Sequence, residues 1–484
     1  MLGVSGMRGI VGASMTPPVA LRYAAAFAEV LREQAGERPT VLVGRDGRLG
    51  GEPLEQAAIA GLLAGGCQVV GLGVASTPTI GYAASASQAH GALIVTASHN
   101  PQEWNGLKLL VRVQAPVGPG GAEQGAVACA PPADLARRII DRFHAREDWS
   151  LVPSSASLCW ESHWPQAHRR HVDALVRAVI PHDAARAWRS AGTQALRCVL
   201  DAVNASGSTV GVPFLDGFGD VLALHASGSG RFPHTPEPTQ ENLSGPGQLC
   251  DIVPAVGASV GFAQDPDADR LAIVDQAGRY IGEELTLVLA AQALLEQEPD
   301  PAGAVLVANL STSRMIDDLA ERFGAQVHRT PVGEAHVAQR MLELLAQGRR
   351  VLLGGEGNGG VIWPAVSFVR DSISAMGLTL SLMARHQEPL GAIVDGLPRY
   401  AILKRKQPLR DRGQAQEAIG TIADHFASRG RIDRQDGVRI DLDDQRAWLS
   451  VRASNTEPIL RLIAEAPTPR DAQALLDQAQ SLLG

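Results

Sequence analysis

The sequence has few of the residues that mark several protein classes. Its five cysteines lie far apart and form no CxxC pair, so neither a disulfide framework nor a cysteine zinc cluster is indicated. Apolar runs such as 285–295 fall well short of the roughly 18–20 residues that span a bilayer. No secretory signal opens the chain, so a cytoplasmic protein without a membrane partner is expected. A formal net charge of -8 argues against non-specific nucleic-acid binding.

What the sequence does contain is typical of a soluble multidomain α/β protein. The chain has 484 residues, of which 45% are hydrophobic and 19% charged. A pattern of apolar strand, polar turn, amphipathic helix and second strand begins three times, near 40, 198 and 304. This alternation predicts three repeated α/β domains. A final segment with a hairpin at 438–452 and a helix near 471–483 predicts a smaller α+β domain. The expected domains are 1–155, 156–277, 278–388 and 389–484.

One stretch lacks any clear period. Residues 114–132 are rich in glycine, alanine and proline. Because such residues favour turns over regular elements, this stretch is expected to be a flexible excursion or irregular loop.

A polar turn follows the apolar run 92–95, which has the pattern of a buried strand. The turn, Thr96–Pro101, holds Ser98 with His99 beside it, and Lys108 follows closely enough to fold back over the serine. Polar turns at the ends of buried strands often hold reactive groups in α/β proteins. A serine is a good nucleophile only beside groups that take its proton or stabilise charge. Ser98 is therefore a candidate nucleophile or, alternatively, the N-cap of a following helix.

Three carboxylates alternate along a second turn, Asp265–Arg270, which lies between two apolar runs. Like charges this close raise one another's pKa, and a divalent cation is the usual remedy. Carboxylate oxygens suit Mg²⁺, and three of them leave room for a phosphate oxygen. An EF-hand is excluded, because Arg270 stands where that loop needs glycine. The turn is either solvated or a magnesium site formed by Asp265, Asp267 and Asp269.

Two further turns offer groups that bind sugars and phosphates. Gly354–Gly360 lets a backbone approach a ligand closely, and its Glu356 and Asn358 suit sugar hydroxyls. Arg452–Pro458 combines a guanidinium, hydroxyls, an amide and turn N–H groups, which are the donors that hold a phosphate dianion. Taken singly, each is also compatible with an ordinary glycine-rich turn or an exposed hairpin end. No GxxxxGK(S/T) motif is present, which argues against a P-loop NTPase.

A serine nucleophile, a divalent metal, a hydroxyl-binding loop and a phosphate cradle together form the set that phosphoryl transfer needs. With these four turns in this order, the chain resembles the α-D-phosphohexomutase family, which includes phosphoglucomutase, phosphomannomutase and phosphoglucosamine mutase. The resemblance covers nearly the whole chain. Supporting matches are Ser5–Gly9, Gly44–Arg48, Pro236–Pro238 and Leu397–Tyr400.

The resemblance implies three repeated α/β domains with mixed sheets and a smaller C-terminal α+β domain around a central cleft. It also implies an isomerase, an intramolecular phosphotransferase that interconverts hexose 1-phosphate and 6-phosphate. Phosphorylated Ser98 would give its phosphoryl group to the substrate, and the resulting 1,6-bisphosphate would reorient and return the other phosphate. The implied cofactors are Mg²⁺, phosphoserine at Ser98 and hexose 1,6-bisphosphate as activator. The implied partner is a phosphate of glucose, mannose or glucosamine, and the oligomeric state stays open.

The resemblance further implies a role for single residues. The magnesium ligands would be the phosphate on Ser98 together with Asp265, Asp267 and Asp269. The acid/base or electrostatic helpers would be Arg8, His99 and Lys108, and which of them moves the proton stays open. The substrate would be bound by Arg270, Gly333, Glu356, Asn358, Arg452, Ser454, Asn455 and Thr456.

Two departures and two alternative functions bear on this hypothesis. The family's sugar loop often has serine where this chain has Asn358 and histidine where it has Gly360, so the substrate stays open. A metal-dependent sugar-phosphate phosphatase would use Ser98 and the metal, but it would need no distal phosphate cradle. A catalytically silent sugar-phosphate-binding paralogue could lose Ser98, the aspartates and Lys108 freely, yet all are present.

Overall fold

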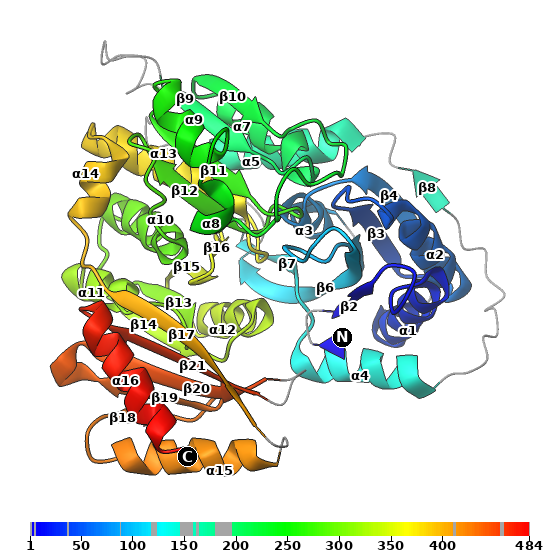
Figure 1. The fold of residues 1–484 in the computed structure, drawn as a ribbon. Coiled ribbons are helices and arrows are strands. Elements are labelled where there is room, and N and C mark those ends of the chain that lie inside the picture. Colours follow the sequence, from blue (N-terminus) through cyan, green and yellow to red (C-terminus); the bar gives the residue numbers. More distant parts are fainter. Residues whose placement is uncertain are drawn as a thin grey trace.

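Four β-sheets follow one another along the chain in this computed structural model. The residues it describes are 2–3, 6–35, 38–87, 89–117, 123–145, 158–160, 164–179, 196–409, 413–454 and 459–483. In Figure 1 the four sheets and their helices form an arc, from blue and cyan through green and yellow to red. We refer to them as the first to fourth units. The expected domain boundaries stay predictions.

The first unit contains an eight-stranded mixed sheet with the order β1-β2-β6-β5-β3-β4-β8, and β7 pairs with β6. Strands β3, β4, β5 and β8 are parallel, whereas β6 is antiparallel to β5. The strands are Leu2–Gly3, Gly6–Ile10, Thr40–Arg45, Gln68–Val74, Gly91–Val95, Trp104–Val117, Glu123–Cys129 and Leu158–Trp160 for β1–β8. The helices are α1 (Pro17–Ala35), α2 (Gly51–Ala64), α3 (Thr77–Ala86) and α4 (Ala133–Ala145).

The second and third units repeat one four-stranded plan, as the sequence pattern predicted. Their sheets have the orders β10-β9-β11-β12 and β14-β13-β15-β16, in which the last strand alone is antiparallel. The second unit has β9 (Arg197–Asp201), β10 (Asp220–Leu224), β11 (Val260–Gln264), β12 (Leu271–Asp275), α5 (Trp164–Val179), α7 (Gly211–Asp216), α8 (Gln240–Leu243) and α9 (Leu249–Ala255). The third has β13 (Val305–Asn309), β14 (Gln326–Thr330), β15 (Val351–Glu356), β16 (Gly360–Ile362), α10 (Glu283–Gln297), α11 (Met315–Arg322), α12 (Glu334–Ala346), α13 (Ser372–His386) and α14 (Leu390–Asp395).

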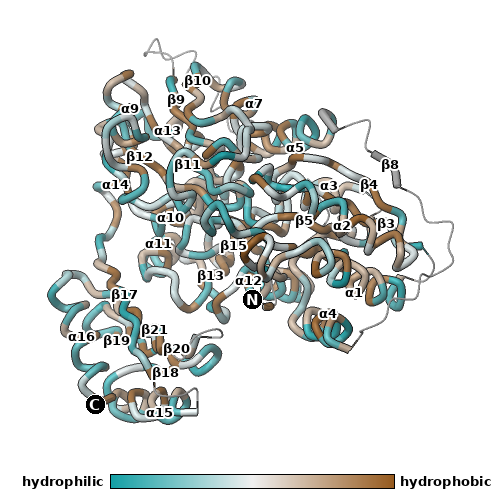
Figure 2. Tube along the Cα trace, turned by 45° about the vertical axis from the view of Figure 1, so that its right-hand side comes forward, coloured by the Kyte–Doolittle hydropathy of each residue, from teal (hydrophilic) through white to brown (hydrophobic). Residues whose placement is uncertain are grey.

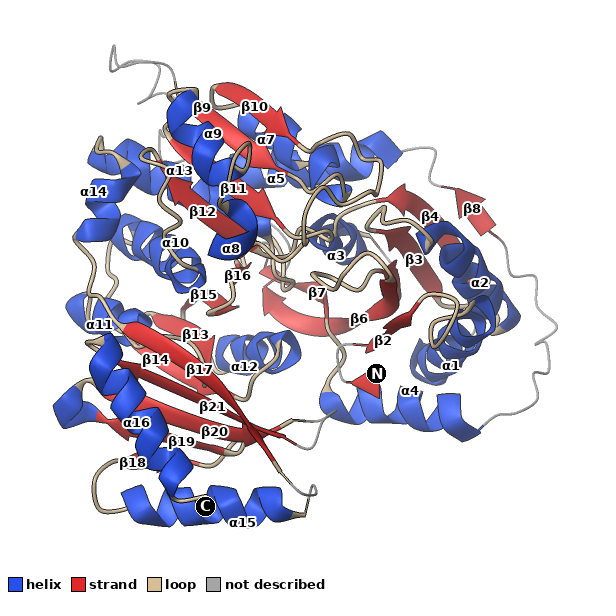
Figure 3. Cartoon of the chain, in the orientation of Figure 1, coloured by secondary structure: helices blue, strands red, loops and turns tan. Residues whose placement is uncertain are grey.

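The fourth unit is a smaller antiparallel sheet of order β17-β21-β20-β19-β18 with two helices, as Figure 3 shows. Its elements are β17 (Ala401–Pro408), α15 (Gln414–Phe426), β18 (Arg431–Asp433), β19 (Val438–Leu442), β20 (Ala447–Ala453), β21 (Ile459–Ala466) and α16 (Pro469–Ser481). Helix α15 buries residues at helical spacing, and it alternates between brown and teal in Figure 2. Those residues are Ala415, Ile419, Ile422, Ala423 and Phe426. The predicted hairpin and C-terminal helix are confirmed.

The second and third units share a hydrophobic core, whereas the fourth unit has its own. One large cluster joins the second unit to the third, for example through Phe214, Phe262 and Leu378. The fourth unit has a cluster of its own, built from α15, α16 and the sheet. The fourth unit therefore contacts the third through polar groups, for example the buried Arg439 guanidinium, which donates to the Leu310 carbonyl, whereas the second and third are packed as one body.

The expected irregular loop at 114–132 is wrong for the residues that the structure describes. Strand β6 continues to Val117 and pairs antiparallel with β7 as far as Cys129. The inner side chains Val127 and Cys129 share a core cluster with Met341 of α12. Alanine and glycine weaken a strand's own propensity, but the long pairing with β6 and burial against the third unit provide the stabilisation that local sequence lacks.

Candidate active site

Ser98 lies in a tight turn between β5 and β6, and a buried scaffold holds it there. Ser98 is 2% exposed and has a φ of +51°, a region that non-glycine residues rarely occupy. The Thr96 hydroxyl accepts from the Ser98 N–H at 2.8 Å, and the Arg48 guanidinium donates to the Ser98 carbonyl. Asp46 fixes Arg48 through a 2.8 Å ion pair. Strand β6 follows this turn, so the alternative of Ser98 as a helix cap is wrong.

The Ser98 hydroxyl meets the acidic turn between β11 and β12, 167 residues further along the chain. Ser98 Oγ donates to Asp265 Oδ2 at 2.8 Å, and Arg270 Nη2 donates to Ser98 Oγ at 3.2 Å. His99 Nδ1 lies 3.5 Å from the same oxygen. The structure thus brings together the predicted nucleophile and the predicted metal turn.

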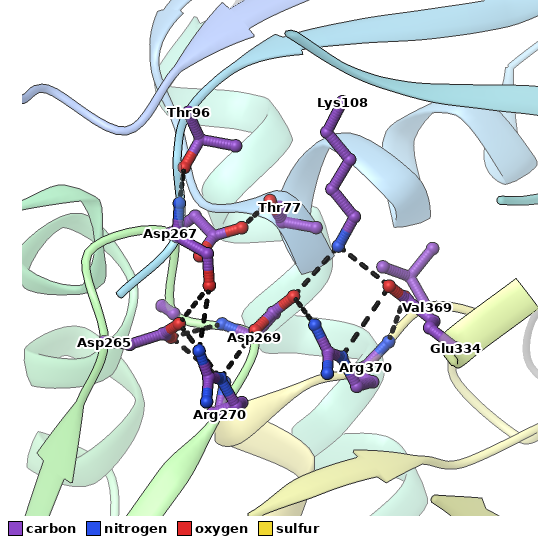
Figure 4. A network of polar contacts seen from close by, with 12 residues as sticks. Thr77, Thr96, Lys108, Asp265, Asp267, Asp269, Arg270, Glu334, Val369 and Arg370 are labelled. Atoms are coloured by element: carbon purple, nitrogen blue, oxygen red, sulfur yellow. Dashed lines mark hydrogen bonds and ion pairs between the residues drawn. The ribbon is translucent and has the colours of Figure 1, made fainter. Parts of the chain in front are cut away.

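The three aspartates of this turn are fully buried and face one another, as Figure 4 shows for their side chains. Asp265 Oδ1 accepts from the N–H groups of residues 269 and 270, and Asp267 Oδ2 accepts from Thr77 Oγ1 at 2.7 Å. Burial raises the pKa of Asp265 and of Asp267, and the charge of Asp269 raises both further. Burial also acts to raise the pKa of Asp269, but Arg370 and Lys108 outweigh it and lower that pKa.

This donor set fits a divalent cation. The carboxylate oxygens of the three aspartates lie within 4.8 Å of one another. Among the described residues, Oδ1 of Asp267 and Oδ1 of Asp269 are buried without a hydrogen-bond partner. Buried acceptors without donors are costly unless a cation meets them. Three buried carboxylates with oxygens left over are suited to Mg²⁺.

A buried network of charges runs from the Asp265–Arg270 turn, the predicted metal turn, to the Gly354–Gly360 loop, the predicted sugar loop. Lys108 Nζ, on β6, lies 2.9 Å from both Asp269 Oδ2 and Glu334 Oε2. Arg370 pairs with Asp269 at 2.6 Å and with Glu356 at 2.7 Å (Figure 4 draws the Asp269 pair). Burial acts to lower the pKa of Lys108, but Asp269 and Glu334 outweigh it and raise that pKa. The two neighbouring carboxylates therefore favour the charged form of Lys108.

Arg8 and His99 are the two remaining residues predicted to help the transfer. Arg8 Nη1 donates to Asn100 Oδ1 at 3.2 Å, and burial lowers the Arg8 pKa. Arg270 Nη2 donates to His99 Nδ1, while His99 Nε2 lies 3.9 Å from Glu237 Oε1. Burial and the charges of Arg270 and Arg8 lower the pKa of His99 far below its usual range. The ring is thus neutral in this arrangement.

The sugar loop joins β15 to β16 and is fixed by Glu356. This carboxylate accepts from Asn309 Nδ2 at 2.8 Å and from the Gly333 N–H at 3.0 Å, which brings the predicted Gly333 to the loop. Asn358 Oδ1 is buried and has no hydrogen-bond partner among the described residues. A Cβ on Gly360 would lie 2.4 Å from Arg370 Cδ. Glycine there leaves room for the arginine side chain.

The predicted phosphate loop is described in part. Arg452, at the end of β20, keeps 21% of its side chain exposed and pairs with Asp436 at 3.6 Å. Burial lowers its pKa, and Asp436 opposes that change. The Ser454 N–H donates to the Ile459 carbonyl at 3.0 Å. Asn455 and Thr456 lie outside the described residues.

Comparisons with known proteins identify one family, whose domain models together match most of the chain. Four models of one family match in order: "Phosphoglucomutase/phosphomannomutase, alpha/beta/alpha" domains I, II and III at residues 1–123, 171–278 and 282–400, and its C-terminal domain at 403–481. The chain belongs to the phosphoglucomutase/phosphomannomutase family. It is an enzyme of the phosphomutase class, an isomerase that transfers phosphate within a molecule.

Individual relatives of this family align over nearly the full length. A "Phosphoglucomutase/phosphomannomutase" of Thermococcus kodakarensis is 34% identical, with 100% of this chain and 98% of the relative covered. A crystal structure of a phosphoglucomutase/phosphomannomutase family protein from Burkholderia thailandensis has a TM-score of 0.79 at 24% identity, covering 100% and 98%. Phosphoglucomutase (parafusin) from Paramecium has a TM-score of 0.73 at 17% identity, covering 99% and 94%. Among the residues that the structure describes, no helix could span a membrane.

Three residues of this phosphomutase site were missed from the sequence: Arg370, Glu334 and Thr77. Arg370 follows the apolar Phe368-Val369 and precedes Asp371, which is a weak signal for a buried ion pair with a distant residue. Glu334 directly follows the predicted Gly333, and Thr77 is the first residue of α3. Their partners Lys108, Asp267 and Asp269 lie 101 to 226 residues away in the sequence, so spacing could not reveal them.

Proposed function

We propose that this chain is a phosphohexomutase that interconverts hexose 1-phosphate and hexose 6-phosphate through a phosphoserine at Ser98. The observation that carries the proposal is the position of Ser98 Oγ, which is 2.8 Å from Asp265 and 3.2 Å from Arg270 inside a buried cluster. Phosphoryl transfer depends mainly on positioning and on neutralising charge. A buried hydroxyl between an acidic metal turn and fixed cations meets both needs.

The proposed reaction balances as two opposite transfers. First, a substrate hydroxyl oxygen forms a bond to the phosphorus on Ser98 as the Ser98 O–P bond breaks, and the hydroxyl proton leaves to a base. The resulting 1,6-bisphosphate turns round, and Ser98 takes the other phosphoryl group while the sugar oxygen that loses it regains a proton. Mg²⁺ held by Asp265, Asp267 and Asp269 would neutralise phosphate charge. No phosphate is gained or lost over the cycle.

The chain's own residues then divide the remaining tasks. Lys108 and Arg270 would be cations beside the transferring group. His99 Nδ1 lies 3.5 Å from Ser98 Oγ but is held by Arg270, so which of Arg8, His99 and Lys108 moves the proton stays open. Glu356 and Asn358 would orient sugar hydroxyls. Arg452 and Ser454, with Asn455 and Thr456, would hold the phosphate that is not transferred.

The substrate is proposed to be the phosphate of glucose, mannose or glucosamine, because relatives with these names cover the chain. Besides the Thermococcus protein, a "Probable phosphoglucosamine mutase" of Methanopyrus kandleri is 31% identical over 98% of this chain. These sugars differ at C2, in configuration or in bearing an amine. A rate panel with all three 1-phosphates therefore ranks them directly.

The deciding experiment compares wild-type protein with Ser98→Ala in a coupled assay containing Mg²⁺ and a trace of hexose 1,6-bisphosphate. We expect turnover of one or more sugars in the wild type, its loss in Ser98→Ala, and phosphate on Ser98 by mass spectrometry. Ser481→Ala is the matched control, because it makes the same change on the exposed C-terminal helix. Release of inorganic phosphate would support the phosphatase instead. Binding without turnover, with Ser98 unmodified, would support the silent paralogue.

A further inference from the structure

A second group of metal-binding side chains lies outside the site described above. Asp201 ends β9, is 1% exposed, and pairs in register with Ala263 of the neighbouring strand β11. Its Oδ2 lies 3.1 Å from His225 Nδ1 and 2.9 Å from His234 Nε2. The three ligand atoms lie within 4.8 Å of one another. Two imidazoles and a carboxylate therefore converge on one point.

The hydrogen bonds of His234 restrict what can lie between these groups. His234 Nδ1 is 2.8 Å from the Thr235 carbonyl, which can only accept, so the proton of a neutral ring is on Nδ1. His234 Nε2 then presents a lone pair to the Asp201 carboxylate, which is repulsive unless a cation or an added proton lies between. Histidines that bind metals characteristically donate their other N–H to a carbonyl in this way.

The distances also suit a bound cation. Bonds of about 2.0–2.1 Å to nitrogen and oxygen place tetrahedral ligands roughly 3.3 Å apart. The observed 2.9 and 3.1 Å need to widen by only a few tenths of an ångström. Asp201 Oδ1 is already fixed by the Val203 N–H at 2.9 Å. The histidine side chains are 23% and 12% exposed, which leaves a route for the ion and a water ligand.

We propose that Asp201, His225 and His234 form a second metal site, which takes a borderline divalent cation such as Zn²⁺ and is separate from the aspartate triad. Imidazole nitrogens favour Zn²⁺, whereas the all-carboxylate triad favours Mg²⁺. The two sites therefore divide the cations between them by ligand chemistry.

A cation at this site would fix the segment 226–233 between the two histidines. This segment contacts the first unit near the Ser98 turn. Gly230 accepts from the Leu49 N–H at 3.4 Å, and the Phe232 N–H donates to Gln102 Oε1 at 2.9 Å. The Phe232 ring also lies 5.2 Å below the Arg48 guanidinium, which holds the Ser98 carbonyl. A cation bound by the histidines thus supports the second unit's contact with the first.

The test is equilibrium dialysis of the full chain against Zn²⁺ with Mg²⁺ in excess, followed by metal analysis. We expect one tightly held Zn²⁺ per chain, and affinity at least about tenfold lower in His225→Asn and in His234→Asn. Asp267→Asn and His328→Asn are controls that should keep the ion. Zn²⁺ retained equally by the His225→Asn/His234→Asn double variant, or no Zn²⁺ retained by the wild type, would overturn the proposal.

A second measurement needs no variant and no activity. X-ray absorption fine structure of the Zn²⁺-loaded wild-type protein should show scattering from imidazole ligands. A shell of oxygen alone would place the ion in the aspartate triad and overturn the proposal. Because neither readout involves turnover, the result is independent of whether the mutase reaction is found.

Discussion

Ser98 and Arg452 belong to the first and last units, and their surroundings differ in kind. Ser98 is 2% exposed and surrounded by buried aspartates and cations with contacts of 2.6–3.2 Å. The Arg452 side chain is 21% exposed and, among the residues that the structure describes, forms one ion pair, to Asp436 at 3.6 Å. The unit that carries Arg452 also has its own hydrophobic core. In the proposed reaction, the surroundings of Ser98 would therefore be preorganised for the transfer, whereas those of Arg452 would be free to admit and release a phosphate.

The largest expected effect is on the catalytic rate, at the aspartate triad beside Ser98. Asp267→Asn keeps an acceptor for Thr77 but removes one negative charge from the triad. We expect kcat at saturating Mg²⁺ to fall by about 10²–10³-fold, because charge placed for the transferring group is lost. Asp220→Asn, at an exposed position, should leave kcat unchanged. Steady-state rates across a Mg²⁺ titration test this; a variant fully restored by extra Mg²⁺ would show that the charge serves affinity alone.

The next effect concerns stability. Arg370→Met would leave Glu356 without its ion pair to Arg370, and Asp269 and Glu334 would keep only Lys108 of their shared cations. We expect the free energy of unfolding to fall by about 3–5 kcal/mol, because a broken buried ion pair leaves uncompensated charge. Arg349→Met, an exposed arginine of the third unit, should change it by less than about 0.5 kcal/mol. Urea unfolding measures both, and equal losses in the two variants would contradict the buried network.

Arg452→Ala should act on the other region with a smaller effect. Loss of a charge-assisted hydrogen bond to phosphate costs about 1.5–3 kcal/mol, which corresponds to a rise in KM of roughly 10- to 100-fold. The free energy of unfolding should hardly change, since the side chain is partly exposed and its ion pair with Asp436 is long, at 3.6 Å. Initial rates over a range of hexose 1-phosphate give the two constants. A fall in kcat at constant KM would place Arg452 in the transfer step instead.

The same contrast explains what the sequence could predict. Ser98 and the three aspartates each follow an apolar strand, so local pattern was enough to find both turns, and the repeated α/β plan followed from the same pattern. Arg370 acts through Asp269, 101 residues away, and no local pattern marks such a pair. The stretch 114–132 was misjudged because its strand β7 is stabilised by the third unit and not by its own composition. Sequence periodicity therefore predicts the local elements but not the long-range packing between them.

A final prediction uses a half-buried carboxyl that, unlike Asp269, has no bonded cation among the described residues. Glu284 is the second residue of α10, and its Oε2 accepts from the Ser313 N–H at 2.9 Å beneath the Gly354–Gly360 loop. Burial raises its pKa from 4.5 to about 8. Between these values the folded protein binds a proton that the unfolded chain has lost, so stability from this group falls as pH rises. The slope reaches about 1.4 kcal/mol per pH unit.

Glu284→Gln removes this titration while keeping a similar shape. We therefore expect the variant to gain stability relative to the wild type as pH rises from 5 to 8, with the difference levelling off above pH ~8. Glu343→Gln, at an exposed position on α12, serves as the control and should show no such trend. Urea unfolding at a series of pH values measures the difference directly. A constant difference across the range would mean that Glu284 is ionised in the folded protein, and that its burial is compensated as fully as that of Asp269.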